Sequence, residues 1–167
     1  GNRDWYIKKY EKLGKEYIQK EKVFEPRIYP RTEVMLNQFK LYHDKKPIKN
    51  ILDFGSGIGN EAFFFVEQFG SRVDCVNISH EENEGSYKLI SENKPELLEN
   101  IKFITSDEDR LAIDQKYDAL HCGEVLEHQP YPDEFMTKLV KFVKKGSPVV
   151  LSVPIGLWED ERHAHLW

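Results

Sequence analysis

A glycine-rich turn directly after a short apolar run is the feature that most limits the folds open to this chain. The run at residues 51–54 is followed by glycines at every second position from Gly55 to Gly59, and then by a helix-length segment at 60–69. Such a turn brings bare backbone to the carboxyl edge of a parallel sheet, where open α/β sheets bind their ligands. We therefore predict a strand, a tight turn and a helix here, with a ligand at the turn.

The rest of the chain repeats this alternation of strand and helix. Further strand-like apolar runs lie at residues 72–78, 101–104, 117–122 and 149–153. Helix-length segments separate them, and the clearest spans 132–145, where apolar residues fall at helical spacing and Gly146 is suited to end the helix. Five strands in βα alternation predict the α/β class, with a doubly wound, mainly parallel sheet.

The N-terminal part follows a different pattern. Aromatic and aliphatic residues interleave with Lys and Glu over 4–22, Pro26 and Pro30 interrupt the pattern, and a second helical stretch covers 32–42. We therefore predict a helical appendage at residues 1–47 and a ligand-binding core at 48–167.

Length and composition indicate a single soluble domain. The chain has no run of about 18 apolar residues and no apolar stretch of the signal-peptide kind at its start. Cys75 and Cys122 both sit inside apolar runs, as is typical of buried thiols in a reducing compartment. These features predict an intracellular, cytoplasmic protein without a membrane span, and they leave the oligomeric state open.

The details of the glycine turn discriminate among nucleotide ligands. Dinucleotide-binding turns use G-x-G-x-x-G, whereas here the third glycine comes one residue early, and the strand before the turn carries a carboxylate, Asp53. A carboxylate repels a pyrophosphate but favours the ammonium group of an amino-acid ligand. No Gly-Lys-Ser/Thr follows, which excludes a Walker-type loop. The turn predicts a zwitterionic, phosphate-free cofactor.

Residues 51–59, Ile-Leu-Asp-Phe-Gly-Ser-Gly-Ile-Gly, resemble motif I of the class I S-adenosylmethionine-dependent methyltransferases. Later segments continue the resemblance in order, at 76–79, 106–107, 117–128 and 146–154, so that it covers about residues 48–155. It implies a Rossmann-like methyltransferase core of the ubiquinone-biosynthesis O-methyltransferase type, with S-adenosylmethionine as cofactor. The cofactor contacts that it implies are Asp53, Gly55, Ser56, Gly57, Gly59, Asn77, Ile78, Asp107, Glu108, Cys122 and Gly123.

The sequence departs from this family at two places. The residue that meets the cofactor's ribose hydroxyls is generally Asp or Glu, and here Asn77 stands in its place. An amide offers one acceptor oxygen and loses the charge-assisted bonds of a carboxylate. The family also has two further strands after the fifth, so we expect the C-terminal strands of the sheet to be missing from this sequence.

A Glu-x-x-Glu-His segment follows the fourth predicted strand. If it starts a helix, Glu124, Glu127 and His128 share one face and could bind a divalent cation together with His163 or His165, in an arrangement that resembles small-RNA 3′-terminal 2′-O-methyltransferases. Alternatively, His128 is a general base, or a purely structural histidine. We predict His128 and Glu124 as the catalytic residues and no metal site; Glu124, Glu127, His128 and His163 are the candidate ligands if a metal binds.

The resemblance implies methyl transfer by direct displacement, for which the protein aligns the acceptor and excludes water. We predict a hydroxyl of a small molecule or glycan as acceptor, because the core is acidic and no Asn-Pro-Pro-Tyr or Asp-Pro-Pro-Tyr amine-binding motif follows the fourth strand. The basic N-terminal segment leaves metal-assisted RNA 2′-O-methylation as an alternative. A non-catalytic Rossmann-like binding domain is another, since Asn77 permits weak cofactor binding.

Overall fold

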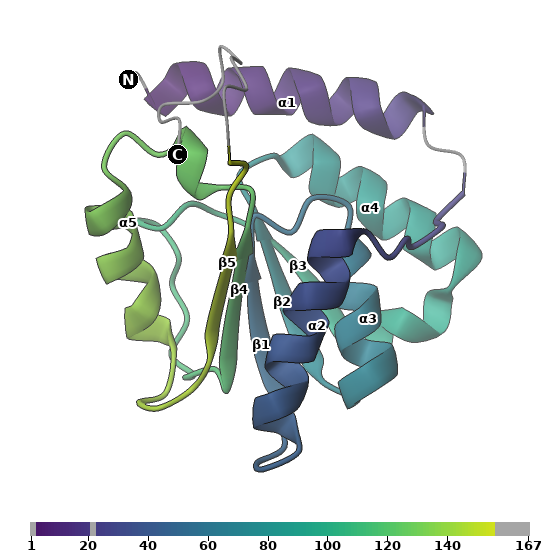
Figure 1. Cartoon of the computed structure of the whole chain (residues 1–167). Helices are drawn as coiled ribbons and strands as arrows, with labels where there is room; N and C mark the ends of the chain where they lie inside the picture. Colours follow the sequence, from purple (N-terminus) through teal and green to yellow (C-terminus); the bar gives the residue numbers. More distant parts are fainter. Residues whose placement is uncertain (1–2, 21–22, 156–167) are drawn as a thin grey trace.

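Five strands form one sheet in which all neighbouring strands are parallel, in the order β3-β2-β1-β4-β5 (Figure 1). The computed structural model describes residues 3–20 and 23–155. The strands are β1 (Asn50–Phe54), β2 (Arg72–Asn77), β3 (Ile101–Thr105), β4 (Ala119–Gly123) and β5 (Val149–Ser152). The chain forms β2 and β3 on one side of β1 and then crosses to form β4 and β5 on the other side. The switch point of the sheet therefore lies between β1 and β4, beside the glycine turn. The predicted doubly wound α/β fold is confirmed.

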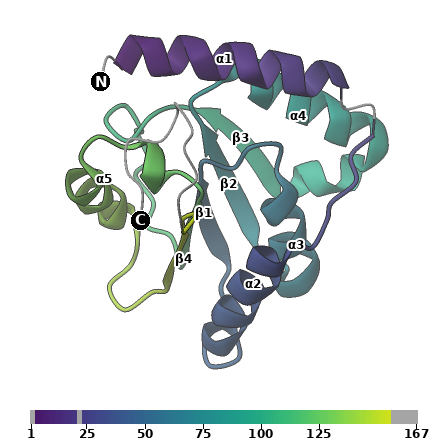
Figure 2. The same ribbon diagram turned by 45° about the horizontal axis from the view of Figure 1, so that its top comes forward.

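The helices lie on both faces of the sheet and across one edge. They are α1 (Arg3–Lys20), α2 (Pro30–His43), α3 (Asn60–Phe69), α4 (His80–Asn93) and α5 (Pro132–Leu139), with short 3-10 helices η1 (Pro95–Glu99), η2 (Leu126–His128) and η3 (Val140–Phe142). α2, α3 and α4 cover one face and α5 the other. α1 packs on α4 and lies across the carboxyl ends of the strands (Figures 1 and 2).

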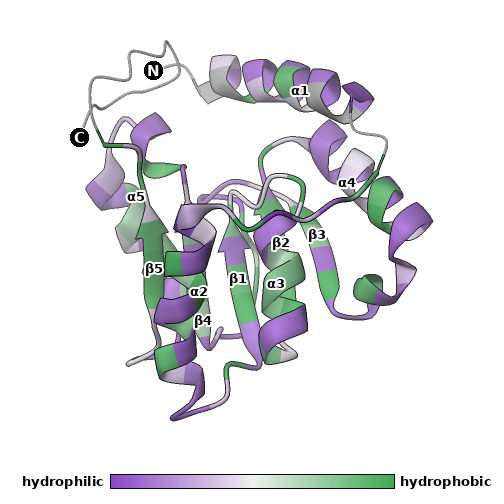
Figure 3. Ribbon diagram, turned by 45° about the vertical axis from the view of Figure 1, so that its right-hand side comes forward, coloured by the Kyte–Doolittle hydropathy of each residue, from purple (hydrophilic) through white to green (hydrophobic). Residues whose placement is uncertain are grey.

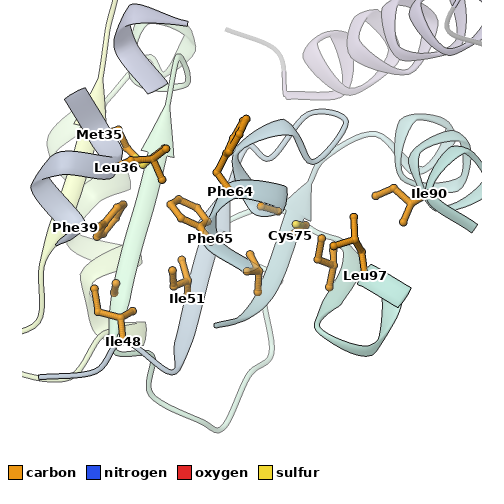
Figure 4. Packing of buried hydrophobic residues seen from close by; sticks show 14 of the residues in the cluster. Met35, Leu36, Phe39, Ile48, Ile51, Phe64, Phe65, Cys75, Ile90 and Leu97 are labelled. Atoms are coloured by element: carbon orange, nitrogen blue, oxygen red, sulfur yellow. The ribbon is translucent and has the colours of Figure 1, made fainter. Parts of the chain in front are cut away.

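Two apolar clusters hold these layers together, one on each face of the sheet. The first joins α2, α3 and α4 to the sheet. In this cluster the rings of Phe39 and Phe65 pack edge to face, with their centroids 5.4 Å apart (Figure 4). The second lies under α5, where Phe135 contacts Phe54 at 5.5 Å. Because both faces are covered, the strands are largely hydrophobic and the helices are mixed (Figure 3).

The prediction of one long helix at 132–145 was wrong beyond Leu139. Tyr117 N–H donates to the Phe142 carbonyl at 2.8 Å, and Lys144 N–H donates to the Tyr117 carbonyl at 2.9 Å. These bonds, with the bridge between Tyr117 and Val143, engage backbone groups that a continuing helix would need. Tyr117 pairs with Val143 in an isolated bridge outside the strands, and β4 begins at Ala119, two residues later than predicted.

The N-terminal residues contribute to the same core as the sheet. Met35, Leu36 and Phe39 of α2 are buried in the first cluster. The division of the chain at residue 47 into an appendage and a core stays a prediction. None of the described helices is long and apolar enough to cross a membrane. Both cysteines are buried and unpaired, as predicted, and burial raises the pKa of each thiol.

Asp118 ties the start of β1 to β4. Its Oδ2 accepts the N–H groups of Lys49 and Asn50 at 3.0 and 2.9 Å, and its Oδ1 accepts from Lys144 Nζ at 2.6 Å. Burial raises the pKa of Asp118, but the hydrogen bonds from Lys144 and from the two backbone N–H groups lower it by more than that. The pKa of Asp118 therefore lies below its usual range.

We expect Asp118→Asn to lower the free energy of unfolding at pH 7 by about 1–3 kcal/mol, because it weakens charge-assisted hydrogen bonds. Since the folded pKa is below the unfolded one, this stabilisation is present above about pH 4 and is lost as the pH falls through the folded pKa. Urea unfolding from pH 7 to pH 3 measures it. The exposed Asp114→Asn is the control; an equal effect of both variants would contradict the prediction.

Candidate active site

The glycine turn has a backbone that only glycine adopts readily. Gly55, Gly57 and Gly59 have φ values of 80°, 52° and 85°, all in the left-handed region. A Cβ atom on Gly55 would lie 2.2 Å from Cγ2 of Val125, so this glycine also permits close approach of the segment after β4. The N–H of Gly55 donates to the Val76 carbonyl of β2 at 2.7 Å, which fixes the turn against the sheet.

The turn opens into a cleft with two parts. One part, the apolar pocket, has a volume of about 410 Å³ and is walled by Tyr10, Phe54, Val76, Ile78, Val125 and Phe135. The other, the charged pocket, has a volume of about 390 Å³ and includes Glu25, Arg27, Arg31, Glu61 and His121. Both parts are lined by Gly55, Gly57, Glu82 and Glu124. The two pockets therefore meet at the glycine turn, at the carboxyl edge of the sheet.

Polar residues after β3 line one end of the apolar pocket. Ser106, Asp107 and Glu108 lie there, as the sequence predicted for the last two. The Asp107 carboxylate accepts the backbone N–H groups of Asp109 and Arg110 at 3.0 and 2.9 Å. Asp107 therefore holds the shape of this loop as well as lining the pocket.

Hydrogen bonds between the segment before α2 and the start of α3 close one side of the charged pocket. The N–H of Arg27 donates to Asn60 Oδ1 at 2.7 Å, and Asn60 Nδ2 donates back to the Arg27 carbonyl at 3.0 Å. Thr32 at the start of α2 also donates to Glu61 at 3.3 Å. These bonds fix the segment before α2 against the first turn of α3, and they bring two arginines to the cleft.

Asp53 and His121 form a buried pair beneath the turn. Asp53 Oδ1 lies 2.8 Å from His121 Nδ1, and their side chains are 1% and 8% exposed. Burial lowers the pKa of His121, and Arg31 lowers it as well, but Asp53 and then Glu61 raise it, with a net rise. His121 lines the charged pocket, so it lies between Asp53 and the cleft. The sequence did not single out His121.

The other predicted cofactor contacts divide into two groups. Those that line the cleft are Gly55, Ser56, Gly57, Asn77, Ile78, Asp107, Glu108 and Gly123. Asp53, Gly59 and Cys122 line neither pocket: Gly59 lies against Phe103, and Cys122 is buried in the cluster under α5. A contact of these three with a cofactor stays a prediction. Sequence reasoning missed Glu82, whose signal was the Ser79-x-x-Glu82 pattern typical of a helix start.

The Glu-x-x-Glu-His segment does not start an α-helix. Glu124 has φ 55°, and η2 is a single 3-10 turn, so the helical spacing that would align the three side chains is absent. Glu124 accepts from Ser152 Oγ at 2.9 Å, and the buried Glu127 lies 3.6 Å from His128 Nε2. The His128 ring faces Tyr10 of α1 at 5.6 Å. Glu124 and His128 both line the apolar pocket.

Within residues 3–20 and 23–155, no three His, Cys, Asp or Glu side chains lie close enough together to hold a metal ion. The candidate ligands His163 and His165 lie outside the described residues.

Comparison with known proteins identifies a family for this chain. Residues 26–167 match a family model described as a methyltransferase domain. The ubiquinone biosynthesis O-methyltransferase of Rickettsia bellii is 29% identical over 153 residues, which cover 88% of this chain and 61% of that protein. The sarcosine/dimethylglycine N-methyltransferase of Aphanothece halophytica is 27% identical over 106 residues, 63% of this chain and 38% of that protein. The chain thus spans about three fifths of the length of the Rickettsia relative.

Solved structures share the fold at low sequence identity. The plantazolicin methyltransferase BpumL, in complex with a pentazolic desmethylPZN analogue and S-adenosylhomocysteine, matches with a TM-score of 0.63 and 19% identity, over 85% of this chain and 52% of that one. The N-methyltransferase NodS from Bradyrhizobium japonicum, bound to S-adenosylhomocysteine, matches with a TM-score of 0.58 and 13% identity, over 83% and 71%. None of these names supports the RNA-methylating or the non-catalytic alternative.

The family match covers the sheet, the glycine turn and the residues that line the cleft. The chain belongs to the methyltransferase domain family, of the class I, S-adenosylmethionine-dependent type.

Proposed function

We propose that this chain transfers the methyl group of S-adenosylmethionine to a hydroxyl group of a small molecule or glycan. The observation that carries the proposal is the two-part cleft at the glycine turn, which has an apolar part for a nucleoside and a charged part for an amino acid. Such complementary parts at the carboxyl edge of a parallel sheet are typical of cofactor sites.

The residues of the cleft fit this cofactor in kind. Phe54, Val76 and Ile78 offer apolar surface to an adenine ring, and Asp107 and Glu108 lie at the end of the pocket. In the charged pocket, Arg27 and Arg31 suit a carboxylate, and Glu25 and Glu61 suit an ammonium group. The turn leaves room between the two parts because Gly55 and Gly57, which line both pockets, carry no side chains.

The chemistry requires little acid or base work from the protein. S-adenosylmethionine supplies the electrophilic methyl group when it is bound, and the chain's own residues hold the acceptor behind that group and keep water out. α1 lies across the sheet edge, and Tyr10 from this helix lines the apolar pocket (Figure 2). It thereby covers the part of the cleft that also contains His128.

In this proposal, His128 takes the proton of the acceptor hydroxyl. It lines the apolar pocket, and the neighbouring Glu127 carboxylate, 3.6 Å from Nε2, helps to orient the imidazole. An imidazole can accept a hydroxyl proton near neutral pH. Glu124 lies where the two pockets meet and contributes negative charge beside the developing imidazolium.

The choice of a hydroxyl over an amine rests on the coverage of the relatives. The Rickettsia O-methyltransferase matches 88% of this chain, whereas the Aphanothece N-methyltransferase matches 63%. The longer match is thus to a relative that is named an O-methyltransferase. It favours the hydroxyl acceptor that the acidic core had already indicated.

Two measurements test the proposed function. Calorimetric titration with S-adenosylhomocysteine should show one-to-one binding, and ligand at 100 times its Kd should raise the free energy of unfolding by about 2.7 kcal/mol. Methyl transfer from S-adenosylmethionine should then be found with catechols or simple glycans and not with amines such as sarcosine. His128→Gln should keep the binding and lose about 100-fold or more of the transfer rate.

These outcomes separate the parts of the proposal. Absence of heat and of a thermal shift at millimolar S-adenosylhomocysteine would remove the methyltransferase assignment for this chain. Transfer to amines alone would remove the hydroxyl acceptor. Transfer to a hydroxyl at an unchanged rate in His128→Gln would remove the general base and leave the rest intact.

A further inference from the structure

Glu82, in the first turn of α4, lies where the two pockets of the cleft meet. It is half-buried and lines both pockets. A Cβ atom on Gly57 of the glycine turn would lie 3.7 Å from its Oε1, and a Cβ atom on Gly14 of α1 would lie 3.2 Å from its Oε2. The absence of a Cβ on Gly57 leaves the carboxylate accessible on the side of the turn, whereas α1 packs closely against Glu82 at Gly14.

The sequence around Glu82 predicts a backbone N–H group, and not a ligand, as the partner of its carboxylate. Ser79 caps α4 and its Oγ accepts the N–H of Glu82 at 3.1 Å, which is one half of a Ser-x-x-Glu capping box. In a complete box the glutamate carboxylate would accept the N–H of the capping serine. Here the N–H of Ser79 donates to Asn77 Oδ1 instead, at 3.1 Å. Asn77 therefore takes over the cap and leaves the Glu82 carboxylate for the cleft.

The same bond determines what Asn77 can offer to a ligand. Its oxygen is engaged by Ser79, and its side chain acts on the Glu82 carboxylate so as to lower the pKa of that group. Because a carboxylate only accepts, the Asn77 amide nitrogen is the atom that can donate to Glu82. At this wall of the cleft, the strong acceptor is therefore Glu82 and not the residue at the end of β2.

We propose that Glu82 accepts the ribose hydroxyls of the cofactor, with Asn77 as the positioning residue that holds its carboxylate. The proposal rests on the proposed function, since it takes S-adenosylmethionine as the ligand. A carboxylate offers two oxygens to the neighbouring hydroxyls of a ribose, and hydrogen bonds to an ionised acceptor are about twice as strong as neutral ones.

The surroundings of Glu82 favour a hydroxyl ligand over further protein contacts. Burial raises the pKa of Glu82, and Asn77 lowers it only in part. The hydroxyls of a bound ribose would restore some of the hydration that burial removes from this carboxylate.

The test is a double-mutant cycle between Glu82 and the ligand's own hydroxyl. The full chain and its Glu82→Gln variant are titrated calorimetrically with S-adenosylhomocysteine and with its 2′-deoxy analogue. We expect Glu82→Gln to weaken binding of S-adenosylhomocysteine about 10- to 100-fold. Binding of the 2′-deoxy analogue should weaken much less, because the hydroxyl that the carboxylate accepts is absent.

Two further variants guard against a merely structural effect. Glu81→Gln changes an exposed acid in the same helical turn, outside both pockets, and should bind both ligands as the unmodified chain does. The double variant Asn77→Asp/Glu82→Gln moves the carboxylate to the end of β2 and should recover most of the affinity. Recovery would also show that the loss in Glu82→Gln is not a failure to fold.

The proposal is overturned if Glu82→Gln binds S-adenosylhomocysteine with unchanged affinity, or weakens the two ligands equally. In both cases the unmodified chain still binds the cofactor product, so the proposed function stands. If the unmodified chain does not bind S-adenosylhomocysteine at all, the proposed function fails and the role of Glu82 fails with it.

Discussion

Gly55→Ala is expected to abolish detectable binding of S-adenosylhomocysteine and to lower the free energy of unfolding by about 2–5 kcal/mol. A left-handed backbone costs a residue with a Cβ roughly 1–2 kcal/mol, and φ here is 80°. The new methyl group would also lie 2.2 Å from Cγ2 of Val125, and relieving such an overlap costs about 1–3 kcal/mol more. Because Val125 walls the apolar pocket, its displacement narrows the cleft.

Urea unfolding and calorimetry of the same variants measure these two effects. Gly70→Ala is the matched control, since φ is 63° and no atom lies within 4 Å of the added Cβ. The free energy of unfolding of Gly70→Ala should fall only by the cost of its left-handed backbone, and this variant should bind S-adenosylhomocysteine as tightly as the unmodified chain does. The double variant Gly55→Ala/Val125→Ala should recover the part of the lost unfolding free energy that comes from the overlap with Val125. If Gly55→Ala behaves like Gly70→Ala in both measurements, the close approach of Val125 does not constrain position 55.

Asp53→Ala is expected to lower the free energy of unfolding by about 3–5 kcal/mol at pH 6. It leaves His121 buried against Phe39 and Phe65 without its carboxylate partner. Breaking one side of a buried charge pair is costly because the remaining charge or polar atom cannot be solvated. Arg31 and Glu61 also act on His121, and they do so in opposite directions.

The effect of Asp53→Ala should depend on pH with a definite sign. Asp53 raises the pKa of His121 above its value in the unfolded chain, about 6.5, so the stabilisation is fully present below that value. It is lost as the pH rises through the folded pKa. The difference between the unmodified chain and the variant should therefore shrink from pH 6 to pH 9 in urea unfolding.

The neutral pair in Asp53→Asn/His121→Gln provides the control. It keeps polar groups of similar size, and the pH dependence that comes from the Asp53–His121 pair should be absent from it. A cost below about 1 kcal/mol for Asp53→Ala at pH 6 would contradict a stabilising charge pair. A difference that stays constant from pH 6 to pH 9 would mean that His121 is neutral in the folded protein throughout this range.

The sequence alone determined the fold class, the parallel sheet and the position of the glycine turn. These depend on local properties: apolar runs of strand length, helical spacing, and glycines where φ must be positive, as at Gly55 and Gly59. The resemblance at 51–59 and the segments after it identified the family for the same reason, because those motifs are continuous in the chain.

Only the tertiary structure decided which polar side chains meet. Asp53 and His121 are 68 residues apart and are joined because β1 and β4 are neighbours in the sheet. The Ser79-x-x-Glu82 pattern predicts a closed capping box, but Asn77 occupies the serine N–H and directs Glu82 to the cleft. Partners of this kind depend on distances across the fold, which the order of residues along one segment does not specify.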